Sequence, residues 1–417
     1  MPIKARREYS GISEKKYGKR AQGKSIILLA DWHADRRYMA NKKLGIYIHI
    51  PFCKSKCIYC DFFSAPAEEH VRKQYLKALC TQINSGAPKL AGEYEVDSIF
   101  FGGGTPSIMD AGELMNVLGA IYNNFNLSDD CEITIECNPG TMDEDKLGIY
   151  REKGVNRLSF GLQSVNDDEL KMLGRIHSFE DFMESYEAAA KSGFDNINID
   201  IMSGIPGQTP AGWRKTLRTV MMLRPAHISA YSLIIEDGTP LGDMYKSGRK
   251  LYLPSEDEER EMYHDTASIL ADNGYGHYEI SNYALAGREC RHNIKYWTRG
   301  EYAGFGAGAS SMIKNIRYNT TKNTPAFIYD PVHVEYDAEE LTVNDCMSEF
   351  MFLGMRMMCG VNRDRFRVTF GRQMDNVFGN VISKYVSTGH IADDGNNVFF
   401  TDKGIDVSNY ILADFLL

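Results

Sequence analysis

From residue 44 to about residue 235, short apolar runs alternate with segments in which apolar positions recur every three or four residues. The short runs are rich in β-branched residues and are typical of buried strands, whereas the periodic segments are typical of helices with one apolar face. Pro-Gly, Gly-Gly and Asn-Pro pairs separate them. The predicted strands are 44–50, 98–101, 132–136, 157–161, 196–202 and 227–233, and the predicted helices are 66–84, 110–123, 143–153, 179–192 and 210–223.

This alternation predicts an α/β fold, because a strand, a helix and a second parallel strand form the βαβ unit. Six such units within residues 44–235 favour a partial, TIM-like (β/α)6 barrel over a closed barrel of eight. In folds of this class, chemistry takes place at the carboxyl ends of the strands. The residues that follow each predicted strand are therefore the candidates for a functional site.

The rest of the chain divides into three further regions. Residues 236–335 are less regular and are predicted to form an α/β extension of the barrel. Residues 336–417 are mainly helical with a β-hairpin near 394–397, which predicts a winged-helix-like C-terminal domain. Residues 1–43 are expected to be a disordered basic extension.

Charge and composition argue against several classes of protein. The 417 residues carry a net charge of −9, which divides into +8 on residues 1–43 and −17 on the remainder. An acidic body repels nucleic acid and anionic membranes, so neither is an expected stable partner. No apolar run approaches the ~18–20 residues needed to span a bilayer. Nine cysteines are too few for a disulfide scaffold in a chain of this length, so we expect a cytoplasmic protein.

Three of the cysteines stand within eight residues. Cys53, Cys57 and Cys60 have the spacing C-x3-C-x2-C and follow Pro51-Phe52 at the end of a predicted strand. Three thiolates on one loop can bind three irons of an iron–sulfur cube and leave the fourth iron open. A zinc site would normally need a fourth ligand, and three thiols clustered by chance would carry no chemistry.

This spacing resembles the radical S-adenosylmethionine (radical SAM) superfamily. The resemblance implies a [4Fe-4S] cluster on Cys53, Cys57 and Cys60, with SAM bound to the open iron and cleaved to a 5′-deoxyadenosyl radical. Gly102-Gly103-Gly104-Thr105 follows the next strand, where glycines let the backbone approach a ligand closely. Carried over by motif, the SAM contacts fall on Tyr47, Tyr59, Gly103, Gly104, Thr105, Glu136, Gln163, Arg175 and Asp200.

A narrower resemblance covers nearly everything from residue 44 onward. Tyr47–Cys53, Phe160–Gln163 and Leu173–His177 are similar to the oxygen-independent coproporphyrinogen III oxidase group. The oxidase itself has a further cysteine two residues after the third ligand, whereas this chain has Phe62. His292-Asn-Ile-Lys-Tyr-Trp297 matches the HNxxYW motif of the HemW-type haem chaperones in the same group.

The HemW-type resemblance implies a protein that binds haem and transfers it to acceptor proteins, with His292 as a haem ligand and Tyr296 and Trp297 against the macrocycle. The alternative is a buried His292 held by hydrogen bonds. The implied partners are haem or another porphyrin, a haem-acceptor protein, and an electron donor such as flavodoxin or ferredoxin. A transient contact with a membrane is also implied.

Two other functions stay open at this point. One is catalysis as a coproporphyrinogen dehydrogenase, and the other is a related radical SAM methyltransferase or haem-degrading enzyme. The residues alone therefore do not decide whether the protein is an enzyme.

Overall fold

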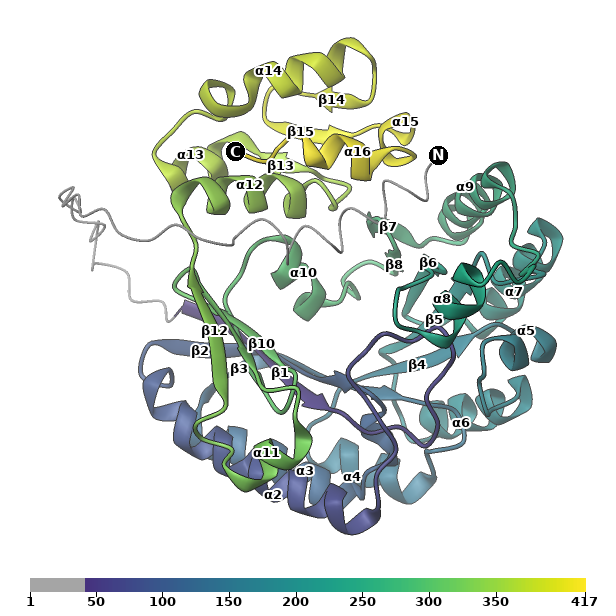
Figure 1. Cartoon of the computed structure of the whole chain (residues 1–417), viewed down its shortest axis with the longest axis vertical. Coiled ribbons are helices and arrows are strands. Elements are labelled where there is room, and N and C mark those ends of the chain that lie inside the picture. The colour runs from purple at the N-terminus through teal and green to yellow at the C-terminus, as the bar shows by residue number, and fades with distance from the viewer. Residues whose placement is uncertain (1–41) are drawn as a thin grey trace.

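The computed structural model describes residues 42–417, so the predicted basic extension, apart from Lys42 and Lys43, lies outside the described residues. Six parallel strands in sequence order form the centre of the sheet. The predicted α/β fold with a mainly parallel sheet is confirmed (Figure 1). The six strands are β1 (Lys42–Ile50), β2 (Tyr94–Gly103), β3 (Asn126–Cys137), β4 (Arg157–Gln163), β5 (Ile197–Ser203) and β6 (His227–Ser232).

Six further strands extend this sheet at both edges. β9 pairs parallel with β1, and three antiparallel strands follow outward from it, while β8 and β7 continue the sheet beyond β6. Residues 236–335 therefore add to the same sheet rather than forming a sheet of their own. These strands are β7 (Gly276–Glu279), β8 (Asn282–Ala284), β9 (Tyr302–Phe305), β10 (Ser310–Ile313), β11 (Ile316–Thr320) and β12 (Glu335–Glu340).

Helices cover the outer, convex face of the curved sheet (Figure 1). Several begin where an Asp, Ser or Thr side chain accepts a hydrogen bond from a backbone N–H of the first turn, as Asp110 and Ser178 do. The helices of this part are α2 (Glu69–Gly86), α3 (Ala111–Asn124), α4 (Glu144–Glu152), α5 (Asp167–Met172), α6 (Phe179–Lys191), α7 (Pro210–Leu223), α8 (Pro240–Lys246), α9 (Glu256–Asp272), α10 (Arg291–Trp297) and α11 (Thr324–Tyr329), with short 3-10 turns at Ala87–Lys89 and Pro106–Ile108.

Strand β1 shows how the sheet separates core from site. Ile46, Ile48 and Ile50 are fully buried in the main apolar core. Tyr47 and His49 alternate with them and point to the opposite, concave face, because successive side chains of a strand leave opposite faces. The concave face is therefore polar and available for ligands.

The C-terminal domain, residues 341–417, has an apolar core of its own around Met351, Phe366 and Phe378. Its helices and a small three-stranded sheet agree with the winged-helix-like prediction, and the expected hairpin joins β14 to β15. Its elements are α12 (Val343–Gly354), β13 (Val361–Asn362), α13 (Arg363–Phe370), α14 (Met374–Ser387), β14 (Ile391–Asp393), β15 (Asn397–Phe400), α15 (Asp402–Ile405) and α16 (Ser408–Ala413).

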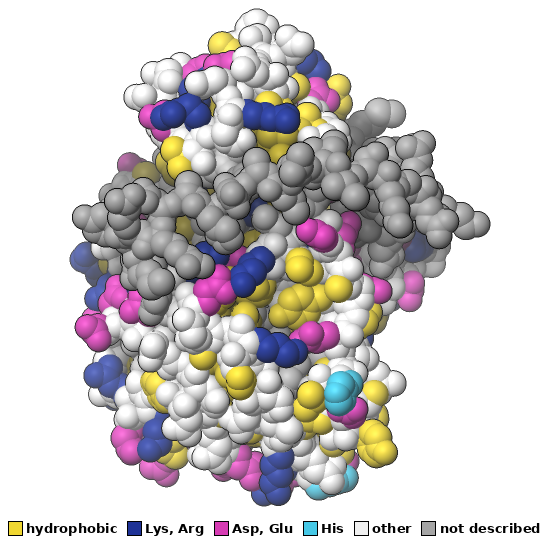
Figure 2. All heavy atoms as spheres, turned by 90° about the vertical axis from the view of Figure 1, so that its left-hand side faces the viewer, with side chains coloured by type: hydrophobic (Ala, Val, Ile, Leu, Met, Phe, Trp, Pro, Cys, Tyr) yellow, Lys and Arg dark blue, Asp and Glu magenta, His cyan; other side chains and the backbone are white. Residues whose placement is uncertain are grey.

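The described surface carries charges of both signs. On the face shown in Figure 2, acidic and basic side chains lie interspersed over the described residues, and no broad basic patch is visible there. Within residues 42–417, no helix combines the length and apolar character needed to cross a bilayer.

A buried ion pair joins the C-terminal domain to the barrel. Arg299 Nε lies 2.8 Å from a carboxylate oxygen of Glu349, and the side chains are only 8% and 9% exposed. Arg317 Nη2 contacts the other oxygen of Glu349 at 2.7 Å. We expect Glu349→Ala to lower the free energy of unfolding by about 3–5 kcal/mol, because it leaves the Arg299 guanidinium buried without its partner.

Chemical denaturation measures this loss. The control is Asp364→Ala, which breaks the exposed pair with Arg367 and should cost no more than about 1 kcal/mol. Equal losses in the two variants would contradict the buried-pair interpretation.

Candidate iron–sulfur and SAM site

The cysteine loop starts at the carboxyl end of β1 and is fixed at several points by backbone hydrogen bonds. Cys53 N donates to Ala65 O at 3.2 Å, and Ile58 N donates to Leu173 O at 3.1 Å. His49 Nε2 also bonds to Phe63 O at 2.9 Å, which ties the end of the loop to β1. The loop is therefore held in place by the barrel itself.

All three predicted cluster ligands line one cavity of about 300 Å³. Cys53, Cys57 and Cys60 are each half-buried and free of disulfides. Within residues 42–417, no three His, Cys, Asp or Glu side chains converge on one ion-sized point. A cube in which each thiolate binds a different iron atom does not require the three thiols to meet at one such point, so the three cysteines stay candidates for it.

Polar groups from two loops contact two of the thiols. Arg175 Nη1 lies 3.6 Å from Cys57 Sγ, and Thr105 Oγ1 lies 3.6 Å from Cys53 Sγ. Burial raises the pKa of the Cys60 thiol. Hydrogen-bond donors and a guanidinium stabilise thiolates in such a site, so the donor set fits an iron–sulfur cluster.

The glycine-rich end of β2 presses against this loop. Gly104 N donates to Ile50 O at 2.8 Å, and Thr105 N donates to Phe52 O at 2.7 Å. A Cβ on Gly104 would lie 2.5 Å from Phe52 O, and Gly103 has a φ of +108° with His49 against it. Only glycine fits at these two positions, because the backbone of β2 lies directly against the cysteine loop and His49. The close approach to a ligand expected from the sequence stays a prediction.

Two carboxylates from different strands face the cavity. Glu136 Oε2 accepts a hydrogen bond from Gly103 N at 3.1 Å, and Asp200 accepts from Asn198 Nδ2 at 2.8 Å. Burial, together with the charge of Asp200, raises the pKa of Glu136 to about 8. Burial also raises the pKa of Asp200. Both carboxyls therefore keep a proton to a higher pH than usual and can donate as well as accept hydrogen bonds toward a ligand in the cavity.

Gln163 and Arg175 complete the side of the site nearest β4. Gln163 is buried with a φ of +70°, which is rare for a residue other than glycine and is found at ligand sites. Its Oε1 accepts a hydrogen bond from Tyr231 at 2.8 Å. Arg175 Nη2 donates to Asn138 Oδ1 at 3.0 Å, so its guanidinium is held between the cluster loop and β3.

A second cavity of about 230 Å³ adjoins the first and shares Glu136, Ser159 and Asp200 with it. We refer to it as the chamber. Arg157 is only 2% exposed there, and its Nε has no hydrogen-bond partner among the described residues. The chamber is lined by Tyr47, Phe100, Glu136, Arg157, Ser159, Asn198, Asp200, Ser229, His292, Asn293 and Tyr296.

The structure therefore brings every residue expected to bind a cofactor to one of two adjoining cavities. Tyr47 and His292 line the chamber, Glu136 and Asp200 line both cavities, and the others line the larger one. Their individual roles stay predictions.

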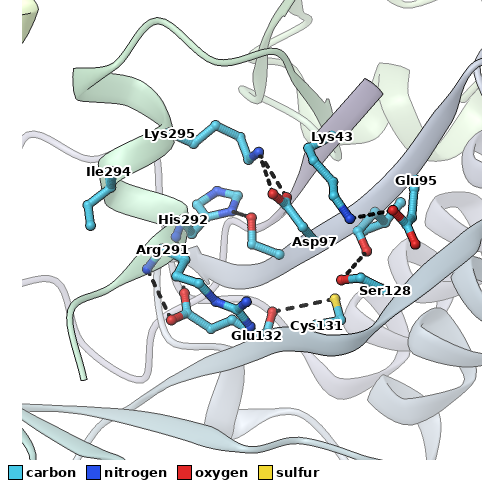
Figure 3. A network of polar contacts seen from close by, with 12 residues as sticks. Lys43, Glu95, Asp97, Ser128, Cys131, Glu132, Arg291, His292, Ile294 and Lys295 are labelled. Atoms are coloured by element: carbon cyan, nitrogen blue, oxygen red, sulfur yellow. Dashed lines mark hydrogen bonds and ion pairs between the residues drawn. The ribbon is translucent and has the colours of Figure 1, made fainter. Parts of the chain in front are cut away.

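His292 is buried rather than exposed at a surface. It is 1% exposed, its Nδ1 lies 3.0 Å from Ser98 Oγ, and its Nε2 lies 2.9 Å from the Tyr296 hydroxyl. Figure 3 shows the His292 ring between α10 and the sheet. This agrees with the alternative considered from the sequence in that His292 is buried, but its partners are side-chain oxygens and not the backbone expected there. Haem ligation by His292 would require one of these two bonds to be replaced.

Four residues of the site were not predicted from the sequence. Tyr231 stands at the end of β6 and could have been found by the same strand-end argument that identified Gln163. Asn138 follows β3 directly. Arg157 and Asn198 lie within strands and have no signal in a single sequence that distinguishes them from core positions.

The parallel barrel, the cysteine loop and the adjoining polar cavities define a radical SAM protein. Residues 47–220 match the Radical SAM superfamily, and residues 341–407 match the HemN C-terminal domain. The fold is similar to that of coproporphyrinogen III oxidase (HemN) from Escherichia coli, with a TM-score of 0.79, 24% identity and 91% of each chain covered.

Relatives that match over nearly their whole length show which family within the superfamily the chain belongs to. The chain is 37% identical over 374 residues to heme chaperone HemW of Bacillus subtilis, which covers 89% of this chain and 98% of that protein. It is 31% identical to heme chaperone HemW of Escherichia coli, again over 89% of this chain and 98% of that protein. The chain belongs to the HemW family, as the motifs predicted.

Cys57→Ala tests the cluster assignment. We expect the anaerobically reconstituted variant to lose the broad iron–sulfur absorption near ~400 nm, because one iron loses its thiolate. The melting temperature of the protein without cluster should be nearly unchanged, since the apolar core is separate from the loop. Cys359→Ala, at an exposed cysteine in the C-terminal domain, is the control and should keep full iron and sulfide content.

Glu136→Gln tests the environment of the carboxyl. The folded protein keeps this proton up to a pH of about 8, whereas a glutamate in the unfolded chain has an ordinary pKa of 4.5. Ionisation therefore destabilises the fold as pH rises between those values, by at most ~1.4 kcal/mol per pH unit. The melting temperature of Glu136→Gln relative to wild type should rise from pH 5 to pH 8 and then level off.

The measurement uses purified protein with no SAM added. Glu152→Gln, at an exposed glutamate, should show no such trend. A difference for Glu136→Gln that is constant across this range would contradict the raised pKa.

Proposed function

We propose that this protein binds haem and transfers it to acceptor proteins, and that it carries a [4Fe-4S] cluster and SAM in the adjoining cavities. The observation that carries this proposal is the match to HemW proteins over 98% of their length at 31–37% identity. The name of those relatives supports haem as ligand and an acceptor protein as partner. The residues of the site support the two resident cofactors.

Each part of the site has a defined task in this proposal. Cys53, Cys57 and Cys60 hold the cluster, which supplies an electron to SAM when both are bound. Gly103 and Gly104 let the end of β2 pack closely against the cysteine loop and His49, and Arg175 contacts the Cys57 thiol. Burial of the site excludes water from the cofactors.

The carboxyls and amides of the site bind the nucleoside and amino-acid groups of SAM. Glu136 and Asp200 offer acceptors for its hydroxyl and amino groups, and Gln163 is fixed by Tyr231. Donor and acceptor groups that are already positioned lower the cost of ordering a polar ligand.

A second function, oxidation of coproporphyrinogen, is favoured by one observation. The SAM-site residues shared with the oxidase group are all present in the two cavities. Against it stands Phe62, which lines the larger cavity, is 60% exposed, and occupies the position of the oxidase's additional cysteine.

An anaerobic assay separates the two functions. Reconstituted protein is mixed with reductant, SAM and either haem and an apo-haem protein such as apomyoglobin, or coproporphyrinogen. We expect haem to bind and pass to the apoprotein, with no decarboxylation of coproporphyrinogen. Measuring 5′-deoxyadenosine in both reactions shows whether SAM is cleaved.

Haem-free apomyoglobin incubated with haem alone gives the rate of transfer without the protein. Decarboxylation of coproporphyrinogen, together with no effect on haem transfer, would reverse the proposal in favour of the oxidase.

A further inference from the structure

The HNxxYW motif forms α10, and side chains of this helix form one wall of the chamber, which we call its floor. His292, Asn293 and Tyr296 line the chamber together with Tyr47 and Glu136, both expected SAM contacts. The motif therefore lies directly against the expected SAM site, on the concave side of the sheet.

Charged residues of β2 and β3 hold α10 against the sheet by hydrogen bonds and an ion pair. Glu132 accepts hydrogen bonds from the backbone N–H groups of Arg291 and His292, each at 3.1 Å (Figure 3). Lys295 Nζ lies 2.8 Å from Asp97, with the lysine side chain only 9% exposed. The start of the helix and Lys295 in its second turn are thus both tied to the sheet, which fixes the direction of the motif side chains.

A glycine in β1 makes this close contact possible. A Cβ on Gly45 would lie 2.7 Å from Lys295 Cδ and 3.3 Å from His292 Cε1. Because the first of these distances is shorter than real contacts, a side chain at residue 45 would displace the Lys295 side chain and crowd the His292 ring. The position of His292 is therefore built into the barrel.

The His292 ring packs in a stack of aromatic rings that ends at the site. Its centroid is 5.3 Å from that of Phe100 and 6.4 Å from that of Tyr47, with interplanar angles of 26° and 30°. Tyr47 in turn bonds to His49 Nδ1 at 3.0 Å, and His49 holds the end of the cysteine loop. Removing His292 would loosen the position of Tyr47.

The hydrogen bonds of His292 leave no ring nitrogen for a metal. Burial lowers the pKa of His292 to about 3, so the ring is neutral and has one N–H and one lone pair. Ser98 and Tyr296 engage both. The chamber volume of about 230 Å³ is also below the ~300–1,000 Å³ of pockets that hold drug-sized ligands, so a haem macrocycle does not fit there.

We propose that His292 is a positioning residue for SAM rather than a haem ligand: it forms the floor of the chamber and fixes Tyr47 and Tyr296 against the cofactor. The inference rests on the proposed binding of SAM, and it assigns the HNxxYW motif to the SAM side of the function. Haem is then bound elsewhere on the protein.

The test compares His292→Ala and His292→Gln with His70→Ala, a variant at an exposed histidine of α2. Each reconstituted protein is assayed for iron content, for SAM affinity by equilibrium dialysis, for haem affinity by absorbance titration, and for the SAM-induced change in the electron paramagnetic resonance spectrum of the reduced cluster.

We expect His292→Ala to weaken SAM binding about tenfold or more, with iron content and haem affinity unchanged. The spectral change should require correspondingly more SAM. Glutamine carries both a donor and an acceptor at its end, so His292→Gln should recover much of the SAM affinity. His70→Ala should match wild type in every measurement.

The opposite pattern overturns the inference. A loss of haem affinity in His292→Ala with unchanged SAM affinity would make His292 a haem ligand and leave the proposed function standing. Equal losses of both ligands that His292→Gln does not restore would reduce His292 to a general structural role. If wild-type protein binds no SAM, the proposed SAM site itself fails, and the inference fails with it.

Discussion

The parallel pairing of β1 to β6 is the constraint on which the site depends. Because all six strands run in the same direction, their carboxyl ends meet at one edge, and residues far apart in sequence become neighbours there. The pairing of Glu136 with Ser159 and of Gly161 with Asp200 sets their relative heights. A register slip of one residue would turn each of these side chains to the opposite, helix-covered face.

The same arrangement explains why buried charges are tolerated. Arg157 is buried and Arg175 is half-buried in the cavities that Glu136 and Asp200 also line, an arrangement that costs stability unless ligands or hydrogen bonds compensate. The fold provides backbone and amide partners for most of these groups and leaves Arg157 Nε and Arg175 Nε without one among the described residues. We interpret that incomplete pairing as a site organised for polar ligands rather than for maximum stability.

Much of the barrel and the site could be predicted from the sequence, because both depend on local patterns. The apolar runs, the periodic segments and the Pro and Gly pairs between them located β1 to β6 and the longer helices within a few residues, except that β3 begins earlier than predicted and the short α5 was not predicted. The strand-end argument identified Glu136 and Gln163, whereas Asp200 came from the family motif. The strands β9 to β12 were not predicted, because they are short and partly exposed and their pairing is decided by distant partners. The burial of His292 depends on Ser98, 194 residues earlier, which no local pattern records.

The pairing of β9 with β1 has a consequence for how the chain is made. One edge of β1 finds its partner in β2 early, but the other must wait until residues 302–305 leave the ribosome. Until then a strand with four fully buried apolar side chains has an open edge, which is a hazard for aggregation during synthesis. Pairing between strands so far apart in sequence also slows folding. We therefore expect the nascent chain to depend on molecular chaperones for protein folding until the sheet is complete.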